Sequence, residues 1–185
     1  MSSRLPLVTL LTDFGSQDTY VGVLKGVIAG VCPAAAIVDL TCDVPPQDIQ
    51  AGAFHLLIAC PYFPAGSVHL AVVDPGVGTD RPLIAVEAGD QRFVGPDNGL
   101  LRWIVEWLAP DTWRAVRLTE PHYWRPPVSH SFHARDIMAP VAAHLAAGIA
   151  LNQVGSPLET LAGTPLPPPT REVDRLRGEI LHIDH

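Results

Sequence analysis

The first 74 residues alternate short apolar runs with stretches in which apolar side chains recur every three or four positions, and this alternation constrains the fold most strongly. The apolar runs, which predict buried strands, are residues 7–12, 37–41 and 68–73. The intervening stretches, which predict helices and are each followed within two residues by a proline, are residues 18–31 and 47–59. This order of strands and helices is typical of a mostly parallel sheet with helices on its faces.

The second half of the sequence predicts a less regular continuation. The expected elements are a hairpin of strands at residues 83–87 and 92–94, a helix at 100–108, a strand at 113–118 and a helix at 133–147. Gly89 and Asp90 favour the hairpin turn, and GPDNG at residues 95–99 favours the turn before the first of these helices. The last helix places His133 near its N-terminus, where oriented N–H groups favour an anion or a hydroxide-like nucleophile.

A proline-rich segment separates this region from the C-terminal residues. The segment is TPLPPPT, residues 164–170, which predicts a stiff linker, and a strand-like run follows at residues 178–183. We therefore expect an α/β domain over residues 1–163, with a mostly parallel central sheet flanked by helices. A linker over residues 164–177 and the first strand of a β-rich domain over residues 178–185 would follow it.

The composition argues against several classes of function. With 185 residues, of which 48% are hydrophobic, the chain can bury one substantial core and has little room for a second full domain. A formal net charge of -7 without a basic stripe argues against a nucleic-acid partner, because phosphate backbones are bound by clustered Lys and Arg. Lys25 is the single lysine, which argues against a Schiff-base lysine and a Walker-type phosphate loop.

The cysteines and the N-terminal residues bear on the cellular compartment. Cys32, Cys42 and Cys60 are odd in number and form no CxxC, so they predict buried thiols in a reducing compartment. The apolar run near the N-terminus is interrupted by Pro6 and ends at Asp13, which makes it too short for a signal sequence or a membrane span. We expect a cytoplasmic protein without a membrane partner.

A carboxylate and a guanidinium stand seven positions apart in VVDPGVGTDR, residues 72–81, as Asp74 and Arg81. A strand that ends in an acid followed by Pro and two Gly turns sharply, which exposes the carboxylate at the carboxyl end of the sheet, where open α/β folds bind ligands. His133 enters later, in SFHARD, residues 131–136. Each residue alone has a structural interpretation as a turn former, a surface arginine or a helix cap, and only the joint pattern favours catalysis.

Two other patterns are weaker. His130 and His133, with His122 nearby, have a spacing that metal ligands use, but they lack acidic or cysteine companions, so we expect no metal. Gly76 and Gly78 form GxG without the rest of a dinucleotide fingerprint, which argues against a Rossmann cofactor.

Five segments together resemble the S-adenosylmethionine hydrolase family, also called the hydroxide adenosyltransferases, which shares its fold with the S-adenosylmethionine-dependent fluorinase and chlorinase. In order along the chain they are LTDFGSQD (11–18), PPQDI (45–49), VVDPGVGTDR (72–81), GPDNG (95–99) and SFHARD (131–136). Each segment is modest alone, whereas the ordered set is highly specific.

The resemblance implies an SN2 attack of water at C5′ of the adenosyl ribose, which releases adenosine and L-methionine without a metal or a cofactor. It also implies that Asp74, Arg81 and His133 hold the water. Because Arg81 stabilises a neighbouring carboxylate in its charged form, we interpret Asp74 and Arg81 as groups that position and polarise the water. We interpret His133 as the better proton acceptor, because the reference pKa of histidine is about 6.5.

The same resemblance implies a set of substrate contacts. Asp13 would accept hydrogen bonds from the ribose hydroxyls, a role that suits a carboxylate. Asp18 and Asn98 are further candidates for contacts to the substrate, and Phe132 is a candidate apolar wall around the ribose or base. The expected partner is therefore a small-molecule substrate.

Two positions favour hydrolysis over halogenation. The halogenases place a Tyr where this sequence has Asp74, and the fluorinase has a halide-binding Ser at the position of Ala134. A dehydrated halide beside Asp74 would be repelled, whereas water would gain a hydrogen-bond acceptor. A halogenase is therefore the less favoured alternative.

The sequence departs from the family at its C-terminal end. Family members continue into a smaller β-rich domain with an aromatic-Gly-Asn stretch and assemble as homotrimers, with substrate between the large domain of one subunit and the small domain of the next. This chain ends at His185, so we expect a truncated β domain and leave the activity of the 185-residue chain alone open. The alternatives are a non-catalytic remnant that binds adenosine or S-adenosylmethionine, and an unrelated nucleoside-binding α/β module.

Overall fold

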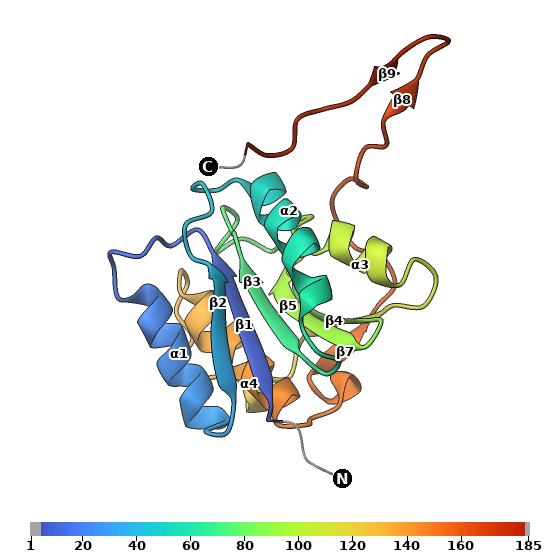
Figure 1. Cartoon of the computed structure of the whole chain (residues 1–185). Helices are drawn as coiled ribbons and strands as arrows, with labels where there is room; N and C mark the ends of the chain where they lie inside the picture. The colour runs from blue at the N-terminus through green and yellow to red at the C-terminus, as the bar shows by residue number, and fades with distance from the viewer. Residues whose placement is uncertain (1–4, 184–185) are drawn as a thin grey trace.

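A seven-stranded sheet forms the centre of the molecule (Figure 1). The computed structural model describes residues 5–183. The strand order is β2-β1-β3-β5-β4-β6-β7. The strands are β1 (Leu7–Thr12), β2 (Ala36–Thr41), β3 (Val68–Val72), β4 (Leu83–Ala88), β5 (Gln91–Pro96), β6 (Arg114–Leu118) and β7 (Gly155–Leu158).

Within the described residues, four α-helices cover the two faces of this sheet (Figure 1). On one face α1 (Tyr20–Val31) packs against α4 (Ala139–Ala146), and on the other α2 (Ile49–Ala59) packs against α3 (Arg102–Leu108). Asp48 is the N-cap of α2, because its carboxylate accepts a hydrogen bond from the amide of Ala51 at 2.9 Å.

The sheet is mostly parallel, as the alternation of elements predicts. β1, β2, β3, β5 and β6 run in one direction, and β4 and β7 run in the other. The expected hairpin is confirmed as β4 and β5. β7 was not expected from the sequence; it pairs with β6 and completes one edge of the sheet.

The apolar runs are continuous because both faces of the sheet are buried. In β3, Leu70 and Val72 belong to the core that includes α1 and α4, whereas Ala71 and the following Val73 belong to the core that includes α2 and α3. Successive side chains of a strand point to opposite faces, so a sheet covered on both sides buries nearly every position. The buried polar side chains of Thr9 in β1 and His69 in β3 are hydrogen-bonded to each other at 2.7 Å.

The register of β1 and β3 brings two acidic residues to the same edge of the sheet. These strands are parallel neighbours, and Thr12 is paired with Val72. The residues that follow them, Asp13 after β1 and Asp74 after β3, therefore leave the sheet side by side. This edge carries the candidate site.

The last expected helix, residues 133–147, is irregular in its first half, ahead of Pro140. Ala134–Met138 form a π-helical turn, in which the amide of Ala139 donates to the carbonyl of Ala134, and α4 continues from it. Pro140 has no N–H to donate to the carbonyl of Asp136, four residues earlier. That carbonyl instead accepts the amide of Arg125 at 2.8 Å, so the proline frees an acceptor for a preceding loop.

The C-terminal residues form a small antiparallel hairpin that projects from the rest of the molecule (Figure 1). Its strands are β8 (Thr170–Arg171) and β9 (Leu176–Arg177). Residues 178–183, where a strand was expected, form none. The turn closed by the amide of Glu172 and the carbonyl of Arg175, 2.8 Å apart, places the second strand at Leu176–Arg177, before residue 178. Residues 184 and 185, the end of the expected β-rich domain, lie outside the described residues.

The helices between residues 5 and 183 are all too short or too polar to cross a membrane.

Candidate active site

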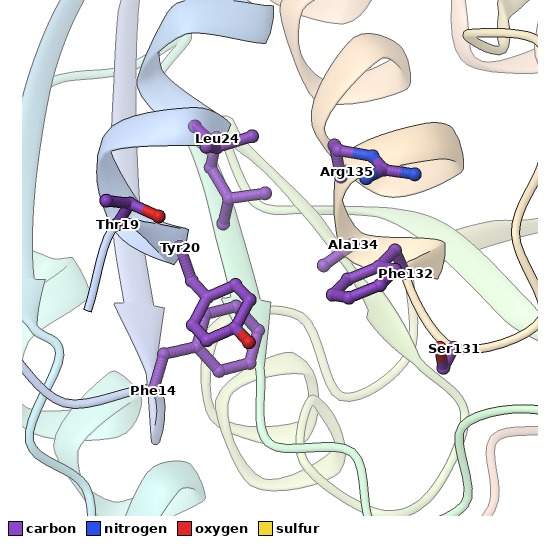
Figure 2. A pocket seen from close by; sticks show the side chains of 9 residues that line it. Phe14, Thr19, Tyr20, Leu24, Ser131, Phe132, Ala134 and Arg135 are labelled. Atoms are coloured by element: carbon purple, nitrogen blue, oxygen red, sulfur yellow. The ribbon is translucent and has the colours of Figure 1, made fainter.

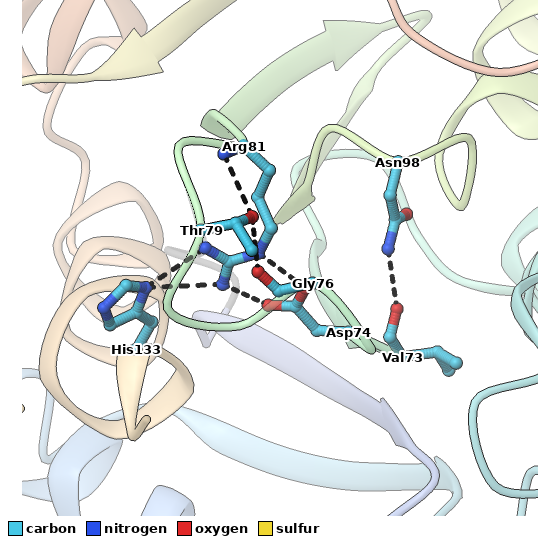
Figure 3. Close-up of polar contacts among 7 residues, drawn as sticks. All are labelled: Val73, Asp74, Gly76, Thr79, Arg81, Asn98 and His133. Carbon is cyan, nitrogen blue, oxygen red and sulfur yellow. Dashed lines mark hydrogen bonds and ion pairs between the residues drawn. The ribbon is translucent and has the colours of Figure 1, made fainter. Parts of the chain in front are cut away.

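Asp74 and Arg81 form a bidentate ion pair at the carboxyl end of β3 (Figure 3). Nε of Arg81 donates to Oδ1 of Asp74 at 2.6 Å, and Nη2 donates to Oδ2. The side chain of Arg81 is only 9% exposed, and that of Asp74 only 6%. Two parallel charge-assisted hydrogen bonds fix the orientation of the carboxylate.

Two glycines shape the loop that joins this pair. A Cβ added at Gly76 would lie 3.0 Å from Cδ of Arg81, so a side chain there would push the arginine away from Asp74. Gly78 has a φ of +85°, and a Cβ there would meet the carbonyl oxygen of His130 at 3.1 Å. The glycines therefore let Arg81 reach back and let the loop pack against residues 129–133.

His133 extends the pair to a third residue (Figure 3). Its Nδ1 lies 3.2 Å from Nη1 and 3.3 Å from Nη2 of Arg81. A guanidinium has no acceptor, so Nδ1 must accept, and the neutral ring carries its proton on Nε2. Burial, followed by the charge of Arg81, lowers the pKa of His133, while Asp74 and Asp136 oppose this shift. The ring is therefore neutral near pH 7 and has no free lone pair at Nδ1.

Asp13 holds a neighbouring loop with one of its oxygens. Its Oδ2 accepts the amide of Gln47 at 2.8 Å, and Gln47 has a positive φ of 65°. Among residues 5–183, no hydrogen-bond partner is found for Oδ1. One carboxylate oxygen of Asp13 is thus available to a ligand.

Two adjoining pockets lie at this edge of the sheet. The first, here called the carboxylate pocket, has a volume of about 350 Å³ and is lined by Asp13, Phe14, Pro46, Gln47, Val72, Asp74, Pro75, Val77, Ser131 and Ala134. The second, the aromatic pocket in Figure 2, has a volume of about 380 Å³ and is lined by Phe14, Thr19, Tyr20, Val23, Leu24, Ser131, Phe132, Ala134 and Arg135. The two share Phe14, Ser131 and Ala134, so one ligand can occupy both.

Phe132 lines the aromatic pocket, and its contact with the ribose or base stays a prediction. Its ring stacks on Tyr20 with centroids 6.1 Å apart, and the guanidinium carbon of Arg135 lies 4.8 Å from its centroid. Tyr20 contributes to the same wall, a role that sequence reasoning missed because its spacing fits the buried face of a helix. The adjacency of Tyr20 to the LTDFGSQD segment was the available signal.

Asp18 and Asn98 do not line either pocket. Asp18 is exposed, next to Thr19 of the aromatic pocket. Both polar atoms of Asn98 serve the scaffold, because Nδ2 donates to the carbonyl of Val73 at 2.8 Å and Oδ1 accepts the amide of Leu100 at 3.1 Å (Figure 3). Asn98 thus secures the end of β3 beside Asp74, and a direct contact with substrate stays a prediction for both residues.

Neither a metal cluster nor a disulfide is found in the part of the chain that the structure describes. Between residues 5 and 183, no three His, Cys, Asp or Glu side chains are grouped as metal ligands would be. Cys32 and Cys60 are buried free thiols, as expected, and Cys42 is a half-buried one.

Comparisons with known proteins identify the family to which this sequence is similar. Residues 8–155 match the family model described as the SAM hydroxide adenosyltransferase N-terminal domain. The chain is 46% identical to the (R)-S-adenosyl-L-methionine hydrolase of Salinispora tropica, over 97% of this chain and 69% of that protein. It is 47% identical to the (R)-S-adenosyl-L-methionine hydrolase of Thermus thermophilus, over 96% of this chain and 70% of that protein. More distant relatives, at 26% to 29% identity, are named fluorinase.

A solved structure supports the same relationship. The crystal structure of an uncharacterized conserved protein from Thermotoga maritima matches with a TM-score of 0.84 and 37% identity, over 89% of this chain and 63% of that one. The chain therefore spans between 63% and 70% of the length of these relatives.

Proposed function

The chain belongs to the SAM hydroxide adenosyltransferase family, and we propose that it hydrolyses S-adenosyl-L-methionine to adenosine and L-methionine. The observation that carries the proposal is the Asp74 carboxylate. It lines a pocket together with Asp13 and accepts two hydrogen bonds from Arg81, which does not line that pocket. Water attacks C5′ of the ribose, a C–O bond forms, and the C5′–S bond breaks.

Asp74 orients the attacking water in this proposal. Arg81 and His133 do not line the carboxylate pocket, so Asp74 is the member of the three that meets the water. Its carboxylate accepts a hydrogen bond from the water and directs an oxygen lone pair toward C5′. Arg81 holds this carboxylate in a fixed orientation, which is the preorganisation that lowers the barrier to a positioned attack.

The proton balance needs no strong base. The leaving group is a neutral thioether and requires no proton, whereas the adenosine oxygen must lose one proton after it bonds to C5′. The geometry supports Asp74 as the first acceptor, with release to solvent, over the His133 that the sequence favoured. The lone pair at Nδ1 of His133 is directed at Arg81, so His133 anchors the guanidinium.

The charges around the pocket match a cationic substrate. The sulfonium carries a positive charge, and Asp13 and Asp74 line the carboxylate pocket. Asp13 uses its available oxygen to accept hydrogen bonds from the ribose hydroxyls. An anionic halide at the position of the water would be repelled by Asp74, and Ala134 offers only a methyl group there.

Product analysis tests this function. We expect purified protein to release equimolar adenosine and methionine in excess chelator, because the proposed reaction uses no metal or cofactor. Release of 5′-halo-adenosine with added halide, without adenosine when halide is left out, would instead identify a halogenase. Methylthioadenosine as the sole product would refute attack at C5′.

We further propose that the protein works in the cytoplasm as a homotrimer, without nucleic acid. The exposed aromatic side chains of Tyr20 and Phe132, 46% and 39% exposed, support a covering partner over the aromatic pocket. The free thiols support a reducing compartment. Light scattering measures the assembly, and a monomer with full activity would refute the requirement for a covering subunit.

A further inference from the structure

Asp136 is a fully buried carboxylate that accepts three hydrogen bonds. Its side chain is 0% exposed and forms a bidentate pair with Arg135, with Nε to Oδ1 at 2.7 Å and Nη2 to Oδ2 at 2.8 Å. Oδ2 also accepts the amide of Ser129 at 2.9 Å, and Nη1 of Arg125 lies 3.6 Å from Oδ1. A buried charge is strongly unfavourable unless it is paired, so these contacts hold each other in place.

The contacts of Asp136 fasten the loop that ends at His133. The side chain of Asp136 holds the amide of Ser129, and its backbone carbonyl, freed by Pro140, holds the amide of Arg125. The loop between these anchors and the π-helical turn carries Ser131 of both pockets. Displacing the Ser129 amide would therefore shift the residues that face the substrate.

The second connection runs through Arg135. Asp136 holds the guanidinium of Arg135, which lies over the ring of Phe132 in the wall of the aromatic pocket (Figure 2). Asp136 itself lines neither pocket. It can affect a reaction only through the residues that it holds.

We propose that Asp136 is a positioning residue of the active site, which sets Phe132 through Arg135 and His133 through the amide of Ser129. The inference rests on the proposed function, since it assigns a role in the same site. It predicts that removing the carboxylate weakens both substrate binding and turnover, because the two connections lead to different parts of the site.

The test compares Asp136→Asn with a matched variant, Glu87→Gln. Glu87 also pairs with two arginines, with Oε1 2.9 Å from Nε of Arg92 and Oε2 bonded to Arg114, and its side chain is 16% exposed. It lies in β4 and is paired with Arg92 at the start of β5. Arg92 is in turn paired with Val68 at the start of β3, so Glu87 lies far from the carboxyl end of β3, where the site is. Its loss removes a similar ion pair without touching the site.

We expect Asp136→Asn to lower kcat/KM by about 10- to 100-fold, the size that follows from small misplacements of reacting groups. Glu87→Gln should leave kcat/KM unchanged. Arg135→Met removes the guanidinium over Phe132 together with the bidentate partner of Asp136, so it should raise KM and lower kcat as well. In ¹⁵N spectra, the Nδ1 resonance of His133 should move in Asp136→Asn and stay in Glu87→Gln.

Specific outcomes would overturn the inference. A folded Asp136→Asn protein with unchanged kcat/KM and an unchanged His133 resonance would do so, as would equal losses in Glu87→Gln. If Asp136→Asn does not fold, the partly exposed Arg135→Met decides, and an unchanged KM there refutes the proposal. If the unmodified protein releases no adenosine, the proposed function fails, and the His133 spectra still decide whether Asp136 positions this residue.

Discussion

Arg81 donates two hydrogen bonds to the carboxylate of Asp74, which lies seven positions earlier in the chain, across a turn. The same guanidinium then donates to His133, 52 positions further along the chain. One arginine thus fixes the direction of the carboxylate that faces the pocket. The following predictions test this arrangement and the fold that supports it.

Asp74→Asn and Arg81→Met should each lower turnover by about 10²-fold or more, the size typical of a positioned electrostatic group. The double variant should be little worse than either single variant, because the first substitution already releases the water. Turnover measurements over the mutant cycle check this. Independent, multiplicative losses would contradict the shared-water arrangement.

Gly76→Ala should reduce turnover without weakening the binding of adenosine. The new Cβ would lie 3.0 Å from Cδ of Arg81, and the nearest atoms that it meets all belong to Arg81 and Thr79, not to the expected ribose site. Gly26→Ala is the matched control, since a Cβ there meets nothing within 4 Å. That substitution should leave activity intact and stabilise α1 by about 0.5–1 kcal/mol. Equal activities of the two variants would show that Arg81 tolerates displacement.

Asp13→Ala should weaken the binding of both substrate and adenosine, because the ribose hydroxyls lose their acceptor and the Gln47 amide loses its partner. Asp90→Ala, in the exposed turn between β4 and β5, is the control and should bind normally. Calorimetric titration with adenosine measures the difference. Unchanged affinity in Asp13→Ala would remove Asp13 from the site.

The buried His69 should make the fold sensitive to acid. Burial lowers the pKa of His69 to about 4 against an ordinary value of 6.5, so the unfolded chain binds this proton first as the pH falls. The contribution of His69 to stability is complete above about pH 6.5 and is lost progressively toward pH 4, by about 1 kcal/mol per pH unit. Urea unfolding at several pH values checks this.

The variant His69→Gln removes the buried ring and should flatten the pH dependence of unfolding over the same interval. A His69 resonance that titrates near pH 6.5 in the folded protein would contradict the expected burial effect.

Much of the fold follows from the sequence by itself. Strand and helix periods, proline stops and the Gly89-Asp90 turn identify β1 to β6 and α1 to α3 within a few residues. The segment from Asp74 to Arg81 likewise marks the candidate site, because an acid after a buried strand and two glycines form a local pattern. Such signals are readable because they depend on neighbours within one turn or one strand.

Only the tertiary structure decided which atoms meet across long separations. Asn98 secures the end of β3, Tyr20 joins the aromatic pocket, and Arg81 faces Nδ1 of His133. The unexpected β7 is a short strand that forms because its backbone hydrogen-bonds to β6. These outcomes depend on packing and on hydrogen-bond partners distant in the chain. The sequence therefore determined the elements and the reactive residue types, while the close packing of the sheet and its loops decided the orientation and the role of each side chain.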